Sequence, residues 1–103
     1  MRDGQPSVYM MANSFYDTLY VGVTSNPAVR VMQHRDGTFA GFTERYNVKR
    51  LVWHDTAATM ADAIIAEKRI KRWRRDWKIA LIECDNPHWN DLGPAIGLPP
   101  LRV

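Results

Sequence analysis

Two short runs of β-favouring residues near the start of the chain constrain its fold most. The first run spans residues 7–13 and contains Tyr9, and the second spans residues 18–24 and contains Tyr20. Residues 14–17 between them supply turn chemistry, so the pattern predicts a β-hairpin with one tyrosine on each strand. Aromatic residues are ordinary in strands, and the two tyrosines can equally be cross-strand packing partners with no further role.

A short helix is expected after the hairpin. The stretch Ser25-Asn26-Pro27 supplies a cap and a proline suited to the first turn, and Asp36-Gly37 ends the segment, which predicts a helix over residues 27–36. Arg30 and His34 are four residues apart and would share one face of this helix. Two donors placed in this way can bind the same phosphate. The ordinary alternative for His34 is a residue favoured by the helix C-terminus.

The rest of the chain alternates between loops and regular elements. Thr59 with Asp62 resembles a capping box that opens a helix, a break is expected near Arg74-Arg75, and Asn86-Pro87 should end the last helix. The expected elements are a loop over residues 37–47, a strand over 48–54, a helix from Thr59 to about Trp73, a helix over 76–84, and a tail from Leu92 to Val103 that is an irregular strap or a frayed end.

The length of 103 residues suits one domain with a modest core. We expect a single domain over residues 1–103, with its core at about 7–92 and an irregular C-terminal tail over 93–103. The single cysteine, Cys84, excludes an internal disulfide and has too few partners for a zinc site, which favours a reducing compartment. No leader-like or membrane-spanning apolar run is present. The chain is therefore expected to be soluble and cytoplasmic, without a membrane partner.

Positive charge is concentrated in one segment. The net charge is +3, but residues 68–78 carry seven lysines and arginines against Asp76 alone, so the rest of the chain is slightly acidic. A basic segment on an otherwise acidic domain is typical of proteins that bind phosphates on one side. The ordinary alternative is a solvated helix face.

A helical wheel places Glu67 at the margin of the buried side of the expected 59–73 helix. At about 100° per residue, apolar residues gather in one stripe and arginines lie opposite. A carboxylate at the edge of a buried stripe suits a group that lines a cleft. The stripe contains Ala63, Ala66, Ile70, Trp73 and Trp77, and the opposite half contains Arg69, Arg72 and Arg75.

Each candidate residue also has a purely structural interpretation. Glu67 and Lys71 can form an ion pair at i,i+4 worth a few tenths of a kcal/mol. Arg30 can pair with Asp55 or with Glu67. The four tryptophans are interpreted as core or rim packing, with base stacking as a minority alternative. These residues are Trp53, Trp73, Trp77 and Trp89.

Taken together, the hairpin tyrosines, the Arg30 and His34 pair and the later Glu67 resemble the GIY-YIG nuclease superfamily. The resemblance covers Tyr9 to about Leu92. Ser7-Val8 replaces the Gly-Ile of the first motif, and Val21 replaces the isoleucine of the second. Four further stretches are similar to small stand-alone bacterial members of the superfamily: residues 41–43, 46–49, 71–74 and 86–89.

The resemblance implies an α+β fold, a three-stranded antiparallel sheet flanked by helices, and a metal-dependent endonuclease that acts on DNA more than on RNA. Glu67 would hold one Mg²⁺ or Mn²⁺ ion, which can be anchored by a single carboxylate. Asn86 matches a family asparagine or simply ends the last helix. The implied catalytic residues are Tyr9, Tyr20, Arg30, His34 and Glu67. The implied nucleic-acid-binding residues are Gly22, Lys49, Lys68, Lys71, Arg72, Arg74 and Arg75.

The residue types fit this chemistry. Arg30 would bind the scissile phosphate through its planar fork, and one tyrosine would orient or activate the attacking water. For Tyr9 this requires a deprotonated phenol or a hydrogen bond to a base such as His34. The choice of base between Tyr9 and Tyr20 stays open. Two other functions are also consistent with the sequence: a nucleic-acid-binding module without activity, and a protein-interaction domain. A homodimer or a recruiting protein could supply specificity.

Overall fold

The computed structural model describes residues 5–14, 17–37 and 47–101. In this part of the chain, strands β1 (Ser7–Ala12), β2 (Leu19–Thr24) and β3 (Arg50–Thr56) form one antiparallel sheet with the order β2-β1-β3. The expected α+β fold with a three-stranded antiparallel sheet is therefore confirmed. The expected loop over 37–47 lies mostly outside the described residues. The helices are α1 (Pro27–Arg35), α3 (Met60–Lys71), α4 (Arg75–Asp85) and the short 3₁₀ turn η1 (Gly93–Ile96).

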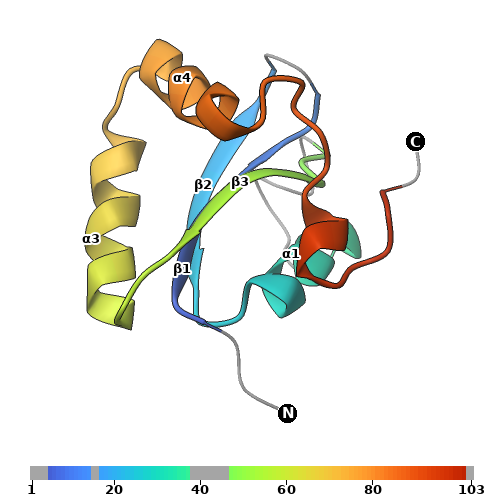
Figure 1. Ribbon diagram of the computed structural model, residues 1–103, viewed down its shortest axis with the longest axis horizontal. Helices are drawn as coiled ribbons and strands as arrows, with labels where there is room; N and C mark the ends of the chain where they lie inside the picture. Colours follow the sequence, from blue (N-terminus) through green and yellow to red (C-terminus); the bar gives the residue numbers. More distant parts are fainter. Residues whose placement is uncertain (1–4, 15–16, 38–46, 102–103) are drawn as a thin grey trace.

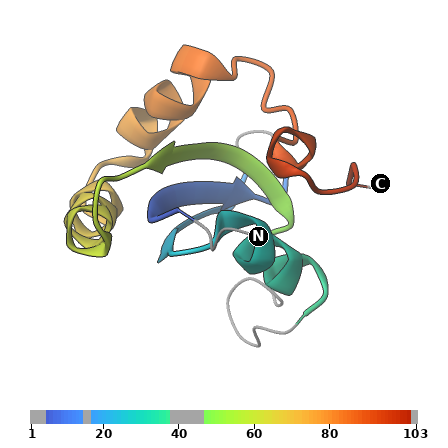
Figure 2. The same ribbon diagram turned by 60° about the horizontal axis from the view of Figure 1, so that its bottom comes forward.

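The sheet is the middle layer of the molecule. Helices α3 and α4 lie on one side, and α1 and η1 lie on the other (Figures 1 and 2). Because alternate strand residues point to opposite faces, two buried clusters form. The cluster under α3 and α4 includes Met10 and Val21, whereas the cluster under α1 includes Tyr9, Met11 and Val31. The two tyrosine strands thus divide their side chains between two separate layers.

The third strand differs in position from the expected 48–54 segment. It runs over residues 50–56, because its pairing with β1 extends from Ala12 opposite Arg50 to Ser7 opposite Thr56. A register irregularity lies opposite Met10 and Met11. The start and end of β3 are therefore set by its pairing with β1, a strand that is distant in the sequence.

The expected helix caps are present. Asn26 accepts a hydrogen bond from the Val29 amide at 3.3 Å, and Thr59 accepts one from the Asp62 amide at 3.1 Å. Helix α1 ends at Arg35, one residue before the expected end. An N-cap hydrogen bond satisfies a backbone donor that has no partner inside the helix.

The break between the last two helices falls where it was expected. Helix α3 ends at Lys71, Arg74 is extended, and α4 begins at Arg75. The wheel was wrong to continue one helix past Lys71, because Trp73, Arg75 and Trp77 lie beyond the end of α3. Trp77 lies on the next helix and is 51% exposed.

The C-terminal tail, as far as Leu101, where the described residues end, is a strap rather than a frayed end. The Leu92 amide donates to the Leu51 carbonyl at 2.8 Å, and Ile96 and Leu98 pack against the cluster under α1. The Arg35 side chain on α1 binds Asp91 at 2.6 Å and the Pro99 carbonyl at 3.1 Å. The tail therefore belongs to the folded core. Among the helices described, none is long and apolar enough to cross a membrane.

Candidate active site

The two hairpin tyrosines lie on the same face of the sheet, diagonally rather than directly opposite. Tyr9 pairs with Gly22 and Tyr20 pairs with Met11, and the tyrosine ring centroids are 6.2 Å apart. His34 reaches them from α1, with its ring edge-on to Tyr20 at 5.1 Å. The Tyr9 Oη and the His34 Nε2 are 2.8 Å apart and share a buried hydrogen bond. The fold thus joins two strands and a helix in one polar cluster, which we call the tyrosine cluster: Tyr9, Tyr20, Arg30 and His34.

Gly22 leaves the space that Tyr9 occupies. A Cβ atom at this position would lie 2.4 Å from the Tyr9 Oη and 2.9 Å from a Tyr20 ring carbon. Both distances are far below van der Waals contact. The space that the missing Cβ leaves at Gly22 is therefore filled by side chains of the cluster. Gly22 itself is buried.

Burial controls the protonation of the tyrosine cluster. It raises the pKa of Tyr9 far above the ordinary value of 10.0, and Tyr20 raises it further, while the charge and hydrogen bonding of Arg30 lower it. Burial also lowers the pKa of His34 from 6.5 to about 4, and the Arg30 charge acts in the same direction. At neutral pH both Tyr9 and His34 are therefore uncharged. The expectation that Tyr9 could act as a deprotonated phenol is opposed by this shift.

Exposure divides the cluster into an inner and an outer part. Tyr9 is fully buried and His34 is 2% exposed, whereas Tyr20 and Arg30 are half-buried. Only the outer pair has surface that a substrate can reach. His34 also lies in the last turn of α1, as its structural interpretation stated. The two interpretations are compatible, because the same position lets its ring share a hydrogen bond with Tyr9.

Glu67 belongs to the other layer of the molecule. It is buried on α3, and its Oε2 lies 2.5 Å from the Lys71 Nζ, so the expected i,i+4 ion pair is present. Helix α3 packs on the sheet face opposite to Tyr9. The sequence suggested that Glu67 lines a cleft, but Glu67 does not line the groove nearest to the tyrosines, and only its ion-pair partner Lys71 reaches that groove. A shallow groove of about 300 Å³ is lined by Leu19, Tyr20, Val21, Lys71 and Lys78.

Glu67 is the single carboxylate that we consider as a ligand for a divalent ion. Within the described parts of the chain, no group of three or more histidine, cysteine, aspartate or glutamate side chains could hold a metal. Glu67 already binds a cation, the Lys71 ammonium. Mg²⁺ keeps most of its waters and needs few protein ligands, so this donor set fits such an ion if Lys71 moves aside.

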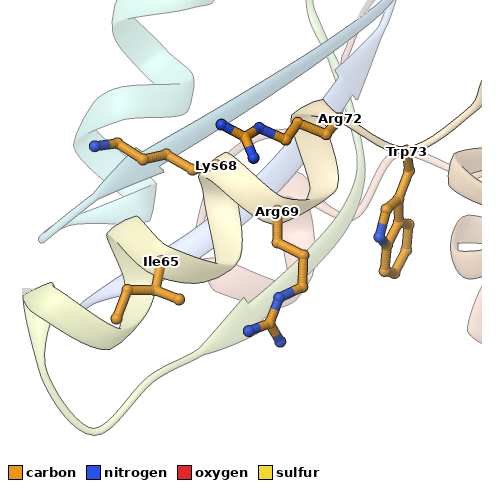
Figure 3. A pocket seen from close by; sticks show the side chains of 5 residues that line it. All are labelled: Ile65, Lys68, Arg69, Arg72 and Trp73. Carbon is orange, nitrogen blue, oxygen red and sulfur yellow. The ribbon is translucent and has the colours of Figure 1, made fainter.

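The basic residues of the α3–α4 region are exposed as expected. Lys68, Arg72, Arg74 and Arg75 all lie at the surface. Figure 3 shows Lys68 and Arg72 on one side of α3, with Arg69 and Trp73 on the other. With Ile65 these four residues line a groove of about 450 Å³, which we call the basic groove.

Three candidate residues have structural contacts of their own. The Arg75 guanidinium donates to the Asp17 carbonyl and so ties α4 to the hairpin turn. The Lys49 carbonyl accepts a 3.0 Å hydrogen bond from Arg35. The Asn86 side chain donates to the Val52 and Asn90 carbonyls and its backbone caps α4. Asn86 therefore ends the helix, as one of its two interpretations required.

Two basic residues beside the expected set were missed. Arg69 lines the basic groove, and Lys78 lines the Tyr20 groove while its Nζ donates to the Lys71 carbonyl at 3.3 Å. Burial and the nearby charges of Arg75 and Lys71 lower the pKa of Lys78. Lys71 and Lys78 are seven residues apart, a spacing that places two side chains on the same face of one continuous helix. Because the two residues lie on different helices, this spacing did not predict that they would meet.

Comparison with known proteins defines the class. The GIY-YIG catalytic domain matches residues 5–80 of the chain, and the chain therefore belongs to the GIY-YIG family of nuclease domains.

Its relatives include UPF0213 proteins of bacteria. One from Bacillus pumilus is 35% identical over 66 residues, which cover 64% of this chain and 67% of the relative. One from Staphylococcus epidermidis is 30% identical over 66 residues, covering 64% of this chain and 80% of the relative. One from Aeromonas salmonicida is 26% identical over 103 residues, covering 97% of this chain and 74% of the relative. No solved structure matches.

Proposed function

We propose that the protein is a metal-dependent endonuclease that hydrolyses phosphodiester bonds in nucleic acid, DNA more than RNA. One observation carries this proposal: the Tyr9–His34 hydrogen bond of 2.8 Å lies beside the half-buried Tyr20 and Arg30, within a GIY-YIG catalytic domain. A buried polar pair next to two accessible groups suits a site that positions a reactive water.

The burial of the cluster supports a division of roles. Arg30 binds non-bridging oxygens of the scissile phosphate and stabilises the charge that develops there. Tyr20 contacts the attacking water and orients it in line with the leaving oxygen. Tyr9 keeps its proton because burial raises its pKa, so it can act as a hydrogen-bond donor but not as the base. Neutral His34 shares the buried 2.8 Å hydrogen bond with the Tyr9 hydroxyl and holds that hydroxyl in place.

Glu67 is the residue that would hold the divalent ion. When bound, the ion would supply charge neutralisation at the leaving oxygen. Tyr20 and Lys71 line the same groove, and Lys71 is the ion-pair partner of Glu67, which supports a substrate path along the β2 edge between the cluster and α3.

The experiment is a cleavage screen with Mg²⁺ or Mn²⁺ on plasmid, single-stranded DNA, branched DNA and RNA. We expect nicks or cuts with the wild-type protein and a loss of at least about 100-fold in Glu67→Ala, because removing a metal anchor removes transition-state charge stabilisation. Asp85→Ala, which removes an exposed carboxylate on α4, is the matched control and should cleave normally. Undiminished cleavage by Glu67→Ala would rule out the metal assignment.

A binding module without activity is the second candidate. It is favoured by one observation, the Lys71 ammonium that lies on the Glu67 carboxylate at 2.5 Å. Such a protein would bind nucleic acid in a salt-sensitive manner and leave every substrate of the screen intact at all metal concentrations.

A further inference from the structure

Two grooves of opposite character meet at Trp73. The basic groove contains Lys68, Arg69 and Arg72 beside Trp73 (Figure 3). The second groove has a volume of about 390 Å³ and is lined by Trp73, Trp77, Ala80, Leu81 and Cys84. We call the second one the tryptophan groove. Since Trp73 lines both, the two grooves form one continuous surface across the α3–α4 break.

The tryptophan groove presents aromatic surface that the fold leaves open. Trp77 is 51% exposed, whereas Trp53 is 8% exposed and Trp89 is fully buried. The Trp73 and Trp77 rings meet edge to face, with centroids 6.1 Å apart. The Arg74 guanidinium lies 4.9 Å from the centre of the Trp77 ring. Burial of a tryptophan side chain is strongly favourable. The exposed half of Trp77 therefore forgoes a stabilisation that packing within the chain does not provide.

We propose that the tryptophan groove stacks unpaired bases of the nucleic-acid substrate while the basic groove binds the phosphates of the same strand. A single strand carries charged phosphates along one edge and flat apolar bases along the other, which matches a basic groove joined to an aromatic one. Arg74 can stack with a base as it does with Trp77. This inference rests on the proposed function, since it defines the part of the substrate that the nuclease recognises.

The charge of the surface disfavours two other occupants. Residues 68–78 carry a balance of +6, and an isologous contact through Trp77 would bring two such segments together with strong repulsion. An intact duplex supplies phosphates but keeps its bases stacked inside the helix. The groove therefore suits a strand with exposed bases.

The test compares three labelled oligonucleotides by fluorescence anisotropy in the presence of EDTA: a single strand, its duplex, and the same strand with abasic sites. We expect Trp77→Ala to bind the single strand roughly 10-fold more weakly, as loss of one stacking platform predicts. Its affinity for the duplex and for the abasic strand should stay within about twofold of wild type. Trp77→Phe should restore most of the loss. Met60→Ala, at an exposed apolar residue of α3 outside both grooves, should bind as wild type does.

Several results would overturn the inference. One is a folded Trp77→Ala protein that binds the single strand normally, and another is equal weakening for all three oligonucleotides. A change of oligomeric state in Trp77→Ala by sedimentation, with unchanged binding, would assign the groove to a second copy instead. If the wild-type protein cleaves nucleic acid while Trp77→Ala binds and cleaves normally, the stacking inference fails and the nuclease proposal stands. If the wild-type protein neither binds nor cleaves nucleic acid, both fail.

Discussion

At the scale of single residues, the hydrogen bond between Tyr9 and His34 is the most informative contact. It is buried and 2.8 Å long, and it connects the first strand with the first helix. The tight fit of both tyrosines against Gly22 fixes their rings in place. The buried part of the cluster is therefore held by packing and by a hydrogen bond, which is what a positioned catalytic group requires.

The two tyrosines should differ in their contribution to catalysis. Tyr20→Phe removes the hydroxyl that we assign to the attacking water, so kcat should fall by about 100-fold or more. Tyr9→Phe removes only a supporting donor, and its loss in kcat should be smaller, about 10-fold, with KM nearly unchanged. Steady-state kinetics of both variants on the preferred substrate of the screen tests this order. The reverse order would make Tyr9 the water-contacting residue.

His34 should make stability depend on pH in the acidic range. Its pKa is about 4 in the folded protein against 6.5 when unperturbed, so between these values the unfolded chain binds a proton that the folded one does not. Stability is therefore present above pH 6.5 and falls as the pH drops, by up to about 3 kcal/mol at pH 4. Urea unfolding from pH 7 to pH 4 measures the slope. His34→Gln should flatten it, and an equally steep slope in this variant would assign the effect to other groups.

At the scale of elements, the C-terminal strap holds α1 in place. Arg35 on α1 and Asp91 form an ion pair at 2.6 Å with side chains only 9% and 15% exposed. The Asp91 carboxylate also accepts from the Gly93 amide at 3.0 Å and the Leu101 amide at 3.1 Å. Since α1 also carries Arg30 and His34, the contacts of the strap with α1 help to hold these two residues of the site in position.

Removing the Asp91 carboxylate should destabilise the protein strongly. Asp91→Ala leaves Arg35 buried without its partner, a change that typically costs about 3 kcal/mol. The comparison is Asp76→Ala, which breaks the Arg74–Asp76 pair whose side chains are 70% and 71% exposed and should cost under about 1 kcal/mol. Urea denaturation of both variants provides the measurement. Similar losses in the two would mean that the strap does not stabilise α1.

At the scale of the whole molecule, the proposed catalytic residues and the basic surface lie on opposite sides of the sheet. The tyrosine cluster lies under α1, and the basic and tryptophan grooves lie on α3 and α4. The groove that Tyr20 shares with Lys71 and Lys78 at the β2 edge lies between them. On the proposed function, a substrate bound along α3 would reach the cluster around this edge.

The salt dependence of binding tests the role of the basic groove. Replacing both Arg69 and Arg72 by alanine removes two phosphate contacts, so the slope of log K against log salt should become shallower by roughly 1.5. The double lysine variant keeps both charges and should retain the slope. Anisotropy titrations over a range of salt concentrations measure it. An unchanged slope in the alanine variant would mean that this helix face is only solvated.

The amino-acid sequence by itself determined the local elements and their order. The hairpin, the caps at Asn26 and Thr59 and the break before Arg75 follow from propensities and patterns within a few residues of each other, and these act in any context. The family pattern likewise depended on Tyr9, Tyr20 and Glu67 in order along the chain.

Only the tertiary structure decided how these residues meet. The diagonal placement of the tyrosines follows from strand register, the protonation of Tyr9 and His34 from burial between layers, and the exposure of Trp77 from the helix break. The strap from Leu92 onward packs through contacts with distant residues such as Leu51 and Arg35. These features depend on packing between segments far apart in the chain, about which local patterns carry no information.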